Sequence, residues 1–225
     1  MSDRICAVVL GATGYVGGEL LRLIAAHPDY EFAAAVSESR SGEKIAATFA
    51  NLAAAYGEAC FVSHSDWLDK IESGAKLALF SAAPHGASAA MIAAALQAAG
   101  DKNITTHVVD SSADFRYARQ QDYEQVYGTT HGAPELLAAF QSGVPEHVKE
   151  VHAAHVGHPG CFATAVLLAT VPLIQSGLTS NEVFVAGITG STGSGRSPQP
   201  GTHHPERHSN LYAYKPLSHR HAPVS

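Results

Sequence analysis

The sequence has few cysteines and no long apolar run, and both shortages exclude classes of protein. Its 225 residues include three cysteines, Cys6, Cys60 and Cys161, which are odd in number and far apart. This pattern predicts neither a disulfide framework nor a structural zinc site built from paired cysteines. No apolar run reaches the length of a membrane span, and no basic leader followed by an apolar stretch opens the chain. We therefore expect a cytoplasmic protein with no membrane partner.

Positive charge is also scarce. The formal net charge is -6, from 14 Lys and Arg against 20 Asp and Glu. General nucleic-acid binding usually needs a basic face, so nucleic acid is not an expected partner. Hydrophobic residues make up 46% of the chain and charged residues 15%, a balance typical of a globular protein with a buried core.

What the sequence does contain is a regular alternation of expected strands and helices. Continuous apolar runs predict buried strands at residues 5–10, 32–36, 75–81 and 104–110. Helical spacing follows at 19–26, and an alanine-rich helix is expected over 85–99. The alternation predicts an α/β fold with a Rossmann-type, doubly wound parallel sheet.

The pattern becomes less regular after residue 111, which indicates a second domain. We expect a dinucleotide-binding domain over residues 1–155 and an α+β catalytic or substrate domain over residues 156–225. In the second domain, the sequence EVFVAGIT predicts a strand at 182–189, followed by a polar glycine-rich loop at 190–198.

A glycine-rich loop, GATGYVG, lies directly between the first expected strand and the first expected helix. Glycines let the backbone turn tightly and approach a pyrophosphate, whose charge is stabilised at the helix N-terminus. The context favours a dinucleotide site over an ordinary strand-to-helix turn. The candidate cofactor-binding residues of this loop are Gly11, Thr13, Gly14, Tyr15, Val16 and Gly17.

The end of the second expected strand bears on the choice of cofactor. An NAD enzyme commonly has an acidic residue there to bind the ribose hydroxyls. Here Val36 is followed by Ser37, Glu38, Ser39 and Arg40. Two hydroxyls and a guanidinium suit a ribose phosphate and favour NADP. Glu38 would instead serve NAD if its carboxylate pointed into the site.

Cys161 stands at the expected start of a helix. Pro159 and Gly160 precede it, and an apolar run follows. Unpaired backbone N–H groups and the positive end of the helix dipole favour a thiolate at such a position. Cys161 is therefore a candidate nucleophile, and the alternative is a buried cysteine that only packs.

Six motifs occur in a fixed order along the chain: GATGYVG at 11–17, APHG at 83–86, VDSSADFR at 109–116, PGC at 159–161, GSGR at 193–196 and HRH at 219–221. Together they resemble the N-acetyl-γ-glutamyl-phosphate reductase family of arginine biosynthesis. Aspartate-semialdehyde dehydrogenase shares the architecture and the cysteine chemistry, but SADFR and HRH favour the first family. Members of that family continue beyond the point where this sequence ends, so the resemblance implies a C-terminally shortened chain with an incomplete second domain.

The resemblance implies NADPH-dependent reduction of a small-molecule acyl phosphate, N-acetyl-γ-glutamyl phosphate, to the 5-semialdehyde with release of inorganic phosphate. The Cys161 thiolate would form a thioester, which hydride from NADPH reduces to the aldehyde. His219 and His221 are candidates for the acid/base. The candidate phosphate or carboxylate ligands are Arg116, Arg196 and Arg220. Further cofactor contacts are expected from Pro84, Gly193 and Gly195.

Other interpretations stay open. The chain could be an aspartate-semialdehyde dehydrogenase-like reductase, or an NADP-binding module without turnover. The segment 203–208 (HHPERH) has ligand-like residues, but Pro205 breaks the helical spacing of a metal motif, so we predict a polar loop and no metal site. An incomplete sheet has an open edge, which favours a homo-oligomer.

Overall fold

The computed structural model describes residues 4–214, which form a six-stranded sheet in the order β2-β1-β3-β4-β6-β5. Every neighbouring pair of strands is parallel. The strands are β1 (Ile5–Leu10), β2 (Tyr30–Val36), β3 (Lys76–Ser81), β4 (Thr105–Asp110), β5 (Phe140–Ser142) and β6 (His155–Gly157). The predicted Rossmann-type parallel sheet is confirmed.

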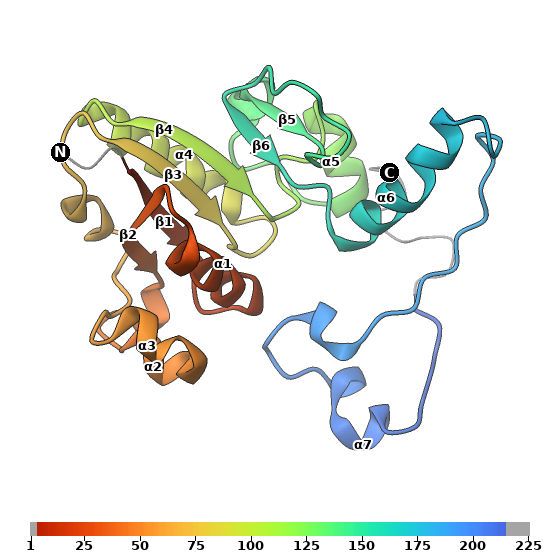
Figure 1. Ribbon diagram of the computed structural model, residues 1–225, viewed down its shortest axis with the longest axis horizontal. Helices are drawn as coiled ribbons and strands as arrows, with labels where there is room; N and C mark the ends of the chain where they lie inside the picture. The colour runs from red at the N-terminus through yellow and green to blue at the C-terminus, as the bar shows by residue number, and fades with distance from the viewer. Residues whose placement is uncertain (1–3, 215–225) are drawn as a thin grey trace.

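Helices cover both faces of the sheet (Figure 1). The α-helices are α1 (Tyr15–Ala26), α2 (Ile45–Thr48), α3 (Ala53–Tyr56), α4 (Ser88–Asp101), α5 (Gln120–Tyr127), α6 (Cys161–Gln175) and α7 (His204–Arg207). Leu21 of α1 packs in a core cluster with Val9 of β1, whereas Ile92 of α4 packs in a second cluster with Val8. Since successive strand residues point to opposite faces, β1 is apolar throughout because both of its faces are buried.

The less regular sequence after residue 111 extends the same sheet. It forms α5, a 3-10 turn at Pro134–Ala139, and the short strands β5 and β6. The predicted boundary between residues 155 and 156 falls inside β6, and the chain leaves the sheet only after Gly157. The division of the chain into two domains stays a prediction.

The segment that follows α6 leads away from the sheet as an extended arm and then turns back toward α1 (Figure 1). The strand expected at 182–189 is wrong: these residues adopt no regular structure, and Phe184 and Ile188 are 96% and 84% exposed. A strand needs a neighbour for its backbone N–H and C=O groups, and no other segment within residues 4–214 pairs with this one. None of the helices in those residues is long and apolar enough to cross a bilayer.

Candidate active site

The sequence motifs meet at one edge of the sheet. The glycine loop follows β1, Pro84 follows β3, residues 111–116 follow β4, and His158 follows β6. Because these strands are parallel, their carboxyl ends lie together at the edge where open α/β sheets bind ligands. Residues far apart in the sequence are therefore neighbours in the site.

Two glycines of the loop are required by the fold. Gly11 has φ +67°, and a Cβ there would come within 2.7 Å of the carbonyl oxygen of Ala82. A Cβ at Gly17 would come within 2.5 Å of the carbonyl oxygen of Ala12. The first glycine therefore lets β1 and β3 lie close at the turn, and the second lets α1 pack closely on the loop.

Gly14 differs, because no contact within residues 4–214 requires it to be glycine. Its φ of -76° is open to any residue, and a Cβ there would meet only the carbonyl oxygen of Gly11, 4.0 Å away. Gly14 is the N-cap of α1, where the first N–H groups of a helix point outward without intrahelical acceptors. The missing side chain leaves space for a pyrophosphate against those groups, so the loop fits a dinucleotide.

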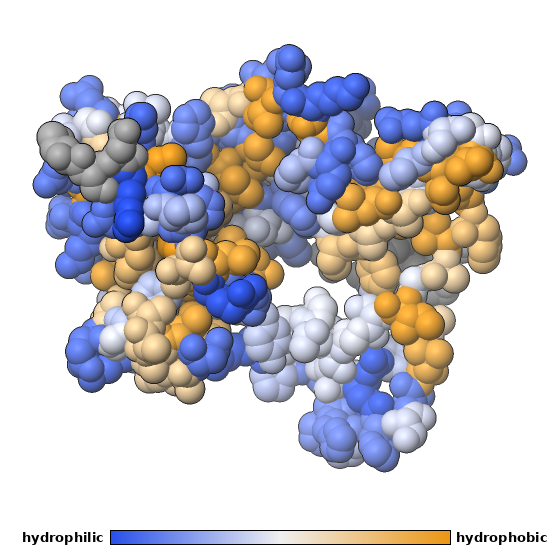
Figure 2. Space-filling view, viewed as in Figure 1, coloured by the Kyte–Doolittle hydropathy of each residue, from blue (hydrophilic) through white to orange (hydrophobic). Residues whose placement is uncertain are grey.

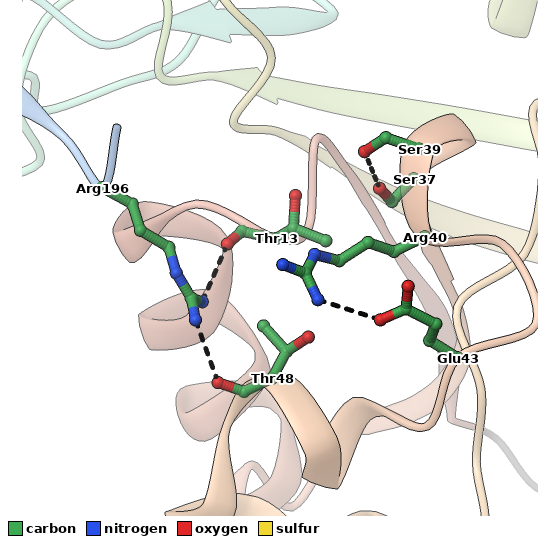
Figure 3. A network of polar contacts seen from close by, with 7 residues as sticks. All are labelled: Thr13, Ser37, Ser39, Arg40, Glu43, Thr48 and Arg196. Carbon is green, nitrogen blue, oxygen red and sulfur yellow. Dashed lines mark hydrogen bonds and ion pairs between the residues drawn. The ribbon is translucent and has the colours of Figure 1, made fainter. Parts of the chain in front are cut away.

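The residues after β2 form a polar group beside this loop (Figure 3). The Oγ atoms of Ser37 and Ser39 lie 3.5 Å apart, and Arg40 donates from Nη1 to Oε2 of Glu43 at 2.9 Å. The carboxylate of Glu38 accepts the backbone N–H of His64 at 3.1 Å. Glu38 is thus engaged with the next loop, whereas the Arg40 guanidinium extends toward Thr13 of the glycine loop.

Arg196 reaches the same place from the C-terminal arm. It donates to the carbonyl oxygens of Thr13 and Thr48, at 3.3 and 3.4 Å, and its guanidinium lies 5.4 Å from the centre of the Phe49 ring. Figure 3 shows the guanidinium groups of Arg40 and Arg196 entering this region from opposite sides. Two positive charges beside a glycine loop suit a phosphate group.

Thr48 is a member of this group that no sequence motif indicates. Its Oγ1 is buried and has no hydrogen-bond partner within the described residues 4–214. The side chain projects into the space between the two guanidinium groups (Figure 3). A buried hydroxyl without a partner is uncommon in folded proteins, and a bound polar ligand would satisfy it.

The other expected cofactor contacts lie around the same loop. Tyr15 and Val16 are exposed in the first turn of α1, and Pro84 is exposed directly after β3. Gly193 lies in a 3-10 turn at Ser191–Ser194, and Gly195 follows it with φ +86° immediately before Arg196. Their contact with a cofactor stays a prediction.

Cys161 is the first residue of α6 and its side chain is exposed, so the predicted helix start is confirmed. The preceding residue, Gly160, is the N-cap and has φ +102°, a conformation that favours glycine. Cys6 and Cys60 are half-buried, and burial, with help from Glu31 and Glu72, raises the pKa of the Cys6 thiol. Cys161 is thus the exposed one of the three thiols.

His158 lies just before Cys161, and both of its ring nitrogens are engaged. Nδ1 accepts the backbone N–H of Gly160 at 3.1 Å, and Nε2 lies 3.3 Å from Oγ1 of Thr164. Burial, together with the nearby charge of Arg116, lowers the pKa of His158 below the ordinary value. His158 was not among the predicted site residues, although it stands next to the PGC motif.

Arg116 is buried, 6% exposed, and bonds to the protein itself. Its Nε donates to the carbonyl oxygen of His158 at 2.9 Å, and Nη1 donates to Oη of Tyr127 at 3.3 Å. Arg116 also lines an open hollow of about 390 Å³ beside α6, with Val144, Leu167 and other residues. Its predicted contact with substrate stays a prediction, and the contact observed is with the turn before Cys161, through the carbonyl of His158.

Two buried aspartates of the VDSSADFR motif were also not among the predicted site residues. Asp110 accepts hydrogen bonds from the hydroxyls of Ser88 and Ser112 at 2.8 and 2.6 Å. Burial raises the pKa of Asp110, although these hydrogen bonds act in the opposite direction. Asp114 accepts the N–H groups of Gly86 and Ala89. These aspartates join the β3–α4 connection to the end of β4.

The remaining candidates, His219, Arg220 and His221, lie outside the described residues. The polar loop predicted at 203–208 is wrong in part, because His204–Arg207 form the short helix α7 with Pro205 in its first turn, where proline is tolerated. The ring of His204 lies 5.5 Å from that of His208, the C-cap of this helix. Within residues 4–214, no three His, Cys, Asp or Glu side chains come together as a metal site.

Comparison with known proteins gives matches over nearly the whole chain. Residues 7–158 match the family model described as semialdehyde dehydrogenase, NAD binding domain, and residues 161–223 match semialdehyde dehydrogenase, dimerisation domain. The chain is 38% identical to the N-acetyl-gamma-glutamyl-phosphate reductase of Azotobacter vinelandii, over 96% of this chain and 60% of that protein.

Two further relatives are named as reductases of acyl phosphates, and one of them has a different substrate in its name. The chain is 36% identical to the N-acetyl-gamma-glutamyl-phosphate reductase of Methanopyrus kandleri, over 96% of this chain and 61% of that protein. It is also 36% identical to the LysW-L-2-aminoadipate/LysW-L-glutamate phosphate reductase of Saccharolobus solfataricus, over 99% of this chain and 61% of that protein. The chain thus spans about 60% of the length of the curated relatives it matches.

Proposed function

The chain belongs to the semialdehyde dehydrogenase family, and from this premise we propose that it carries out NADPH-dependent reduction of N-acetyl-γ-glutamyl phosphate to N-acetylglutamate 5-semialdehyde. Inorganic phosphate is the second product. The observation that carries the proposal is the position of Cys161, an exposed thiol at the first residue of α6. Cys161 comes after β6, at the same edge of the sheet as the glycine loop that comes after β1.

Cys161 acts as the nucleophile in this proposal. Its Sγ forms a bond to the acyl carbon, the bond from that carbon to the phosphate oxygen breaks, and inorganic phosphate leaves with the electron pair. A thioester on Cys161 remains. The hydride for reduction of this thioester carbonyl would come from NADPH held beside the glycine loop. The C–S bond then breaks to release the aldehyde, and a proton restores the thiol.

The acid/base in this proposal is His219 or His221, with His219 slightly favoured by the family resemblance. Histidine suits this role because its ordinary pKa lies near neutral pH. Arg220 lies between them in the sequence and is proposed, with Arg116 and Arg196, to bind phosphate or the substrate carboxylate.

NADP is the cofactor that the site supports best. Gly14 provides space for the pyrophosphate, and the residues after β2 offer two hydroxyls and the Arg40 guanidinium to a ribose phosphate. Glu38, the residue that would favour NAD, hydrogen-bonds to the backbone of His64 instead. Arg196 and Thr48 add a second guanidinium and a hydroxyl beside the glycine loop.

A related substrate class competes with this proposal. The relative from Saccharolobus solfataricus, named for LysW-linked aminoadipate and glutamate phosphates, is 36% identical to the chain, close to the 38% of the Azotobacter protein. Both names describe reduction of an acyl phosphate, so the cysteine chemistry is the same for both. The acyl group is what separates them.

One assay tests the activity and the substrate together. Phosphate-dependent oxidation of N-acetylglutamate 5-semialdehyde by the full 225-residue chain should form NADPH. Cys161→Ala should abolish this turnover but still bind NADPH, whereas Cys60→Ala should keep the activity. Turnover by Cys161→Ala would show that Cys161 is not the nucleophile. The proposed substrate would be wrong if aspartate semialdehyde were oxidised faster than N-acetylglutamate 5-semialdehyde. It would also be wrong if only a carrier-linked semialdehyde were oxidised.

Self-association is part of the proposal. The model matched by residues 161–223 is described as a dimerisation domain, and this region exposes large apolar side chains, including Leu178, Phe184, Ile188 and Leu211. Figure 2 shows apolar surface over α6 and the arm that follows it. Large exposed apolar patches mark interaction sites. We expect light scattering to give at least twice the chain mass of 23.5 kDa. A monomer at micromolar concentration would contradict this.

A cytoplasmic location remains a prediction from the sequence.

A further inference from the structure

The ring of His158 connects the end of β6 to the first turn of α6. Its Nδ1 accepts the backbone N–H of Gly160, and its Nε2 contacts Oγ1 of Thr164. Thr164 lies one helical turn after Gly160 and donates its hydroxyl to the carbonyl oxygen of Gly160 at 2.8 Å. Cys161 therefore lies between two residues that the same imidazole contacts.

These contacts define the protonation of the ring. A backbone N–H can only donate, so Nδ1 must be unprotonated to accept from Gly160. A neutral imidazole then has its proton on Nε2, and this N–H donates to Oγ1 of Thr164. Because the hydroxyl of Thr164 donates onward to Gly160, the three groups form a closed chain of hydrogen bonds. Burial and the charge of Arg116 lower the pKa of His158 and so favour the neutral ring that these contacts require.

The turn before Cys161 depends on this chain. Gly160 has φ +102° and, as the N-cap of α6, has no side chain that could cap the helix. The contacts to its N–H and C=O come from His158 and from Thr164, whose backbone N–H also bonds to the Gly160 carbonyl at 2.9 Å. On the other side, Arg116 fixes the carbonyl oxygen of His158.

We propose that His158 is a positioning residue for Cys161: its neutral ring holds Gly160 and the first turn of α6 so that the Cys161 thiol stays exposed at the helix N-terminus. The inference rests on the proposed role of Cys161 as the nucleophile. His158 is not the acid/base, since both ring nitrogens already have partners in the protein. Its effect on the reaction passes through the geometry of the helix start.

The experiment measures alkylation of each cysteine by iodoacetamide in the full-length chain, with peptide mass spectrometry as the readout. His158→Ala loses both ring contacts, and we expect alkylation of Cys161 to slow by about fivefold, the effect of about one lost hydrogen bond. Cys60, far from this turn in the sequence, is the internal reference and should react at an unchanged rate.

Two matched variants separate positioning from general loosening of the fold. His158→Asn places a carbonyl oxygen where Nδ1 was, so it can again accept the N–H two residues on and should restore the Cys161 rate to within about twofold of the original. Thr164→Val loses the Nε2 contact and the hydroxyl bond to the Gly160 carbonyl but keeps the Nδ1 contact, so it should give an intermediate rate. If His158→Ala does not fold, Thr164→Val and His158→Asn decide the question. Long-range nitrogen–proton NMR spectra should show the Nε2–H form of His158.

An unchanged Cys161 rate in folded His158→Ala, or an equal slowing of Cys161 and Cys60, overturns the inference. So does the Nδ1–H form of the ring. These readouts need no substrate, so they are independent of turnover. Absence of phosphate-dependent NADPH formation by the unaltered chain would instead overturn the proposed function. In the semialdehyde oxidation assay, His158→Ala should lower kcat and leave KM for NADP unchanged, and His158→Asn should recover kcat.

Discussion

The side-chain carboxylate of Asp114 accepts the backbone N–H of Ala89 at a distance of 3.0 Å, in the first turn of α4. Its other oxygen accepts the N–H of Gly86 at 2.8 Å and the hydroxyl of Tyr123 at 3.2 Å. A residue that follows β4 thus caps the helix that follows β3. The SADFR motif therefore stabilises the site edge as well as marking the family, because it ties two strand-to-helix connections together.

This relationship predicts a large effect of Asp114 on stability. Asp114→Ala would leave the buried N–H of Ala89 and the part-buried N–H of Gly86 without their acceptor, so we expect the free energy of unfolding to fall by about 3 kcal/mol. Urea denaturation followed by circular dichroism measures the change. Asp122→Ala is the matched control, because Asp122 pairs with Arg119 at the surface and should contribute less than about 1 kcal/mol. Equal effects of the two substitutions would refute the capping role.

The glycines of the first loop should separate folding from cofactor binding. Gly11→Ala forces a side chain into the backbone of Ala82 at positive φ, and we expect a loss of about 2–3 kcal/mol in unfolding free energy. A Cβ at Gly14 would make only an ordinary contact, 4.0 Å from the carbonyl oxygen of Gly11, so the unfolding free energy of Gly14→Ala should change by less than about 1 kcal/mol. Its NADPH affinity should nevertheless fall at least about tenfold, because the methyl group occupies the space proposed for the pyrophosphate.

Fluorescence titration with NADPH, run beside urea denaturation, checks both variants. Gly74→Ala is a suitable control for the effect of positive φ alone, because a Cβ at Gly74 would meet no atom of the described part of the chain within 4 Å. It should lose less stability than Gly11→Ala and bind NADPH normally. Normal NADPH affinity in Gly14→Ala would show that the pyrophosphate does not bind at this loop.

Arg40 should determine the preference between the two nicotinamide cofactors. Arg40→Ala removes a guanidinium proposed to pair with the ribose phosphate, so NADPH affinity should fall at least about tenfold while NADH affinity stays the same. Glu38→Gln should leave both affinities nearly unchanged, because Glu38 faces His64. Equal losses for both cofactors would place Arg40 elsewhere in the site, and a loss of NADH affinity in Glu38→Gln would favour NAD.

Local patterns were sufficient to predict the nucleotide half of the fold. The run at residues 5–10 and the glycines that follow it are contiguous, so one short segment contains the strand, the turn and the helix start. The start of α6 at Cys161 could be predicted for the same reason, since Pro159 and Gly160 stand next to it. In these places the physical determinants are neighbours in the sequence.

The missed residues act over longer separations. Asp114 bonds to Gly86 and Ala89, 28 and 25 residues away, and Arg116 reaches His158 across 42 residues. The periodic pattern of apolar residues along the sequence does not predict such long-range contacts. The strand expected at 182–189 failed for a related reason, because β-propensity describes a segment and a strand also needs a partner. The effect of Glu38 depended on its contact with His64, which the sequence alone did not show.

Acid should destabilise the protein through His155 and His158. Burial is the main cause that lowers the pKa of both, with His107 adding to the effect at His155 and Arg116 at His158. The folded state therefore binds fewer protons than the unfolded state just below pH 6.5, the ordinary histidine pKa. Their contribution to stability is complete above that pH and is lost as the pH falls through the lowered folded values. The loss is at most about 1.4 kcal/mol per pH unit for each histidine.

Urea denaturation at pH 7.5, 6.5 and 5.5 would measure this loss, and substitution isolates its source. His155→Gln and His158→Asn cannot titrate, so each should reduce the difference in unfolding free energy between the two lower pH values. Asp110 opposes the trend, because burial raises its pKa and its contribution is lost as the pH rises. It is the same in all three proteins, so the comparison cancels it. An unchanged pH dependence in both variants would show that neither histidine is kept neutral by the fold.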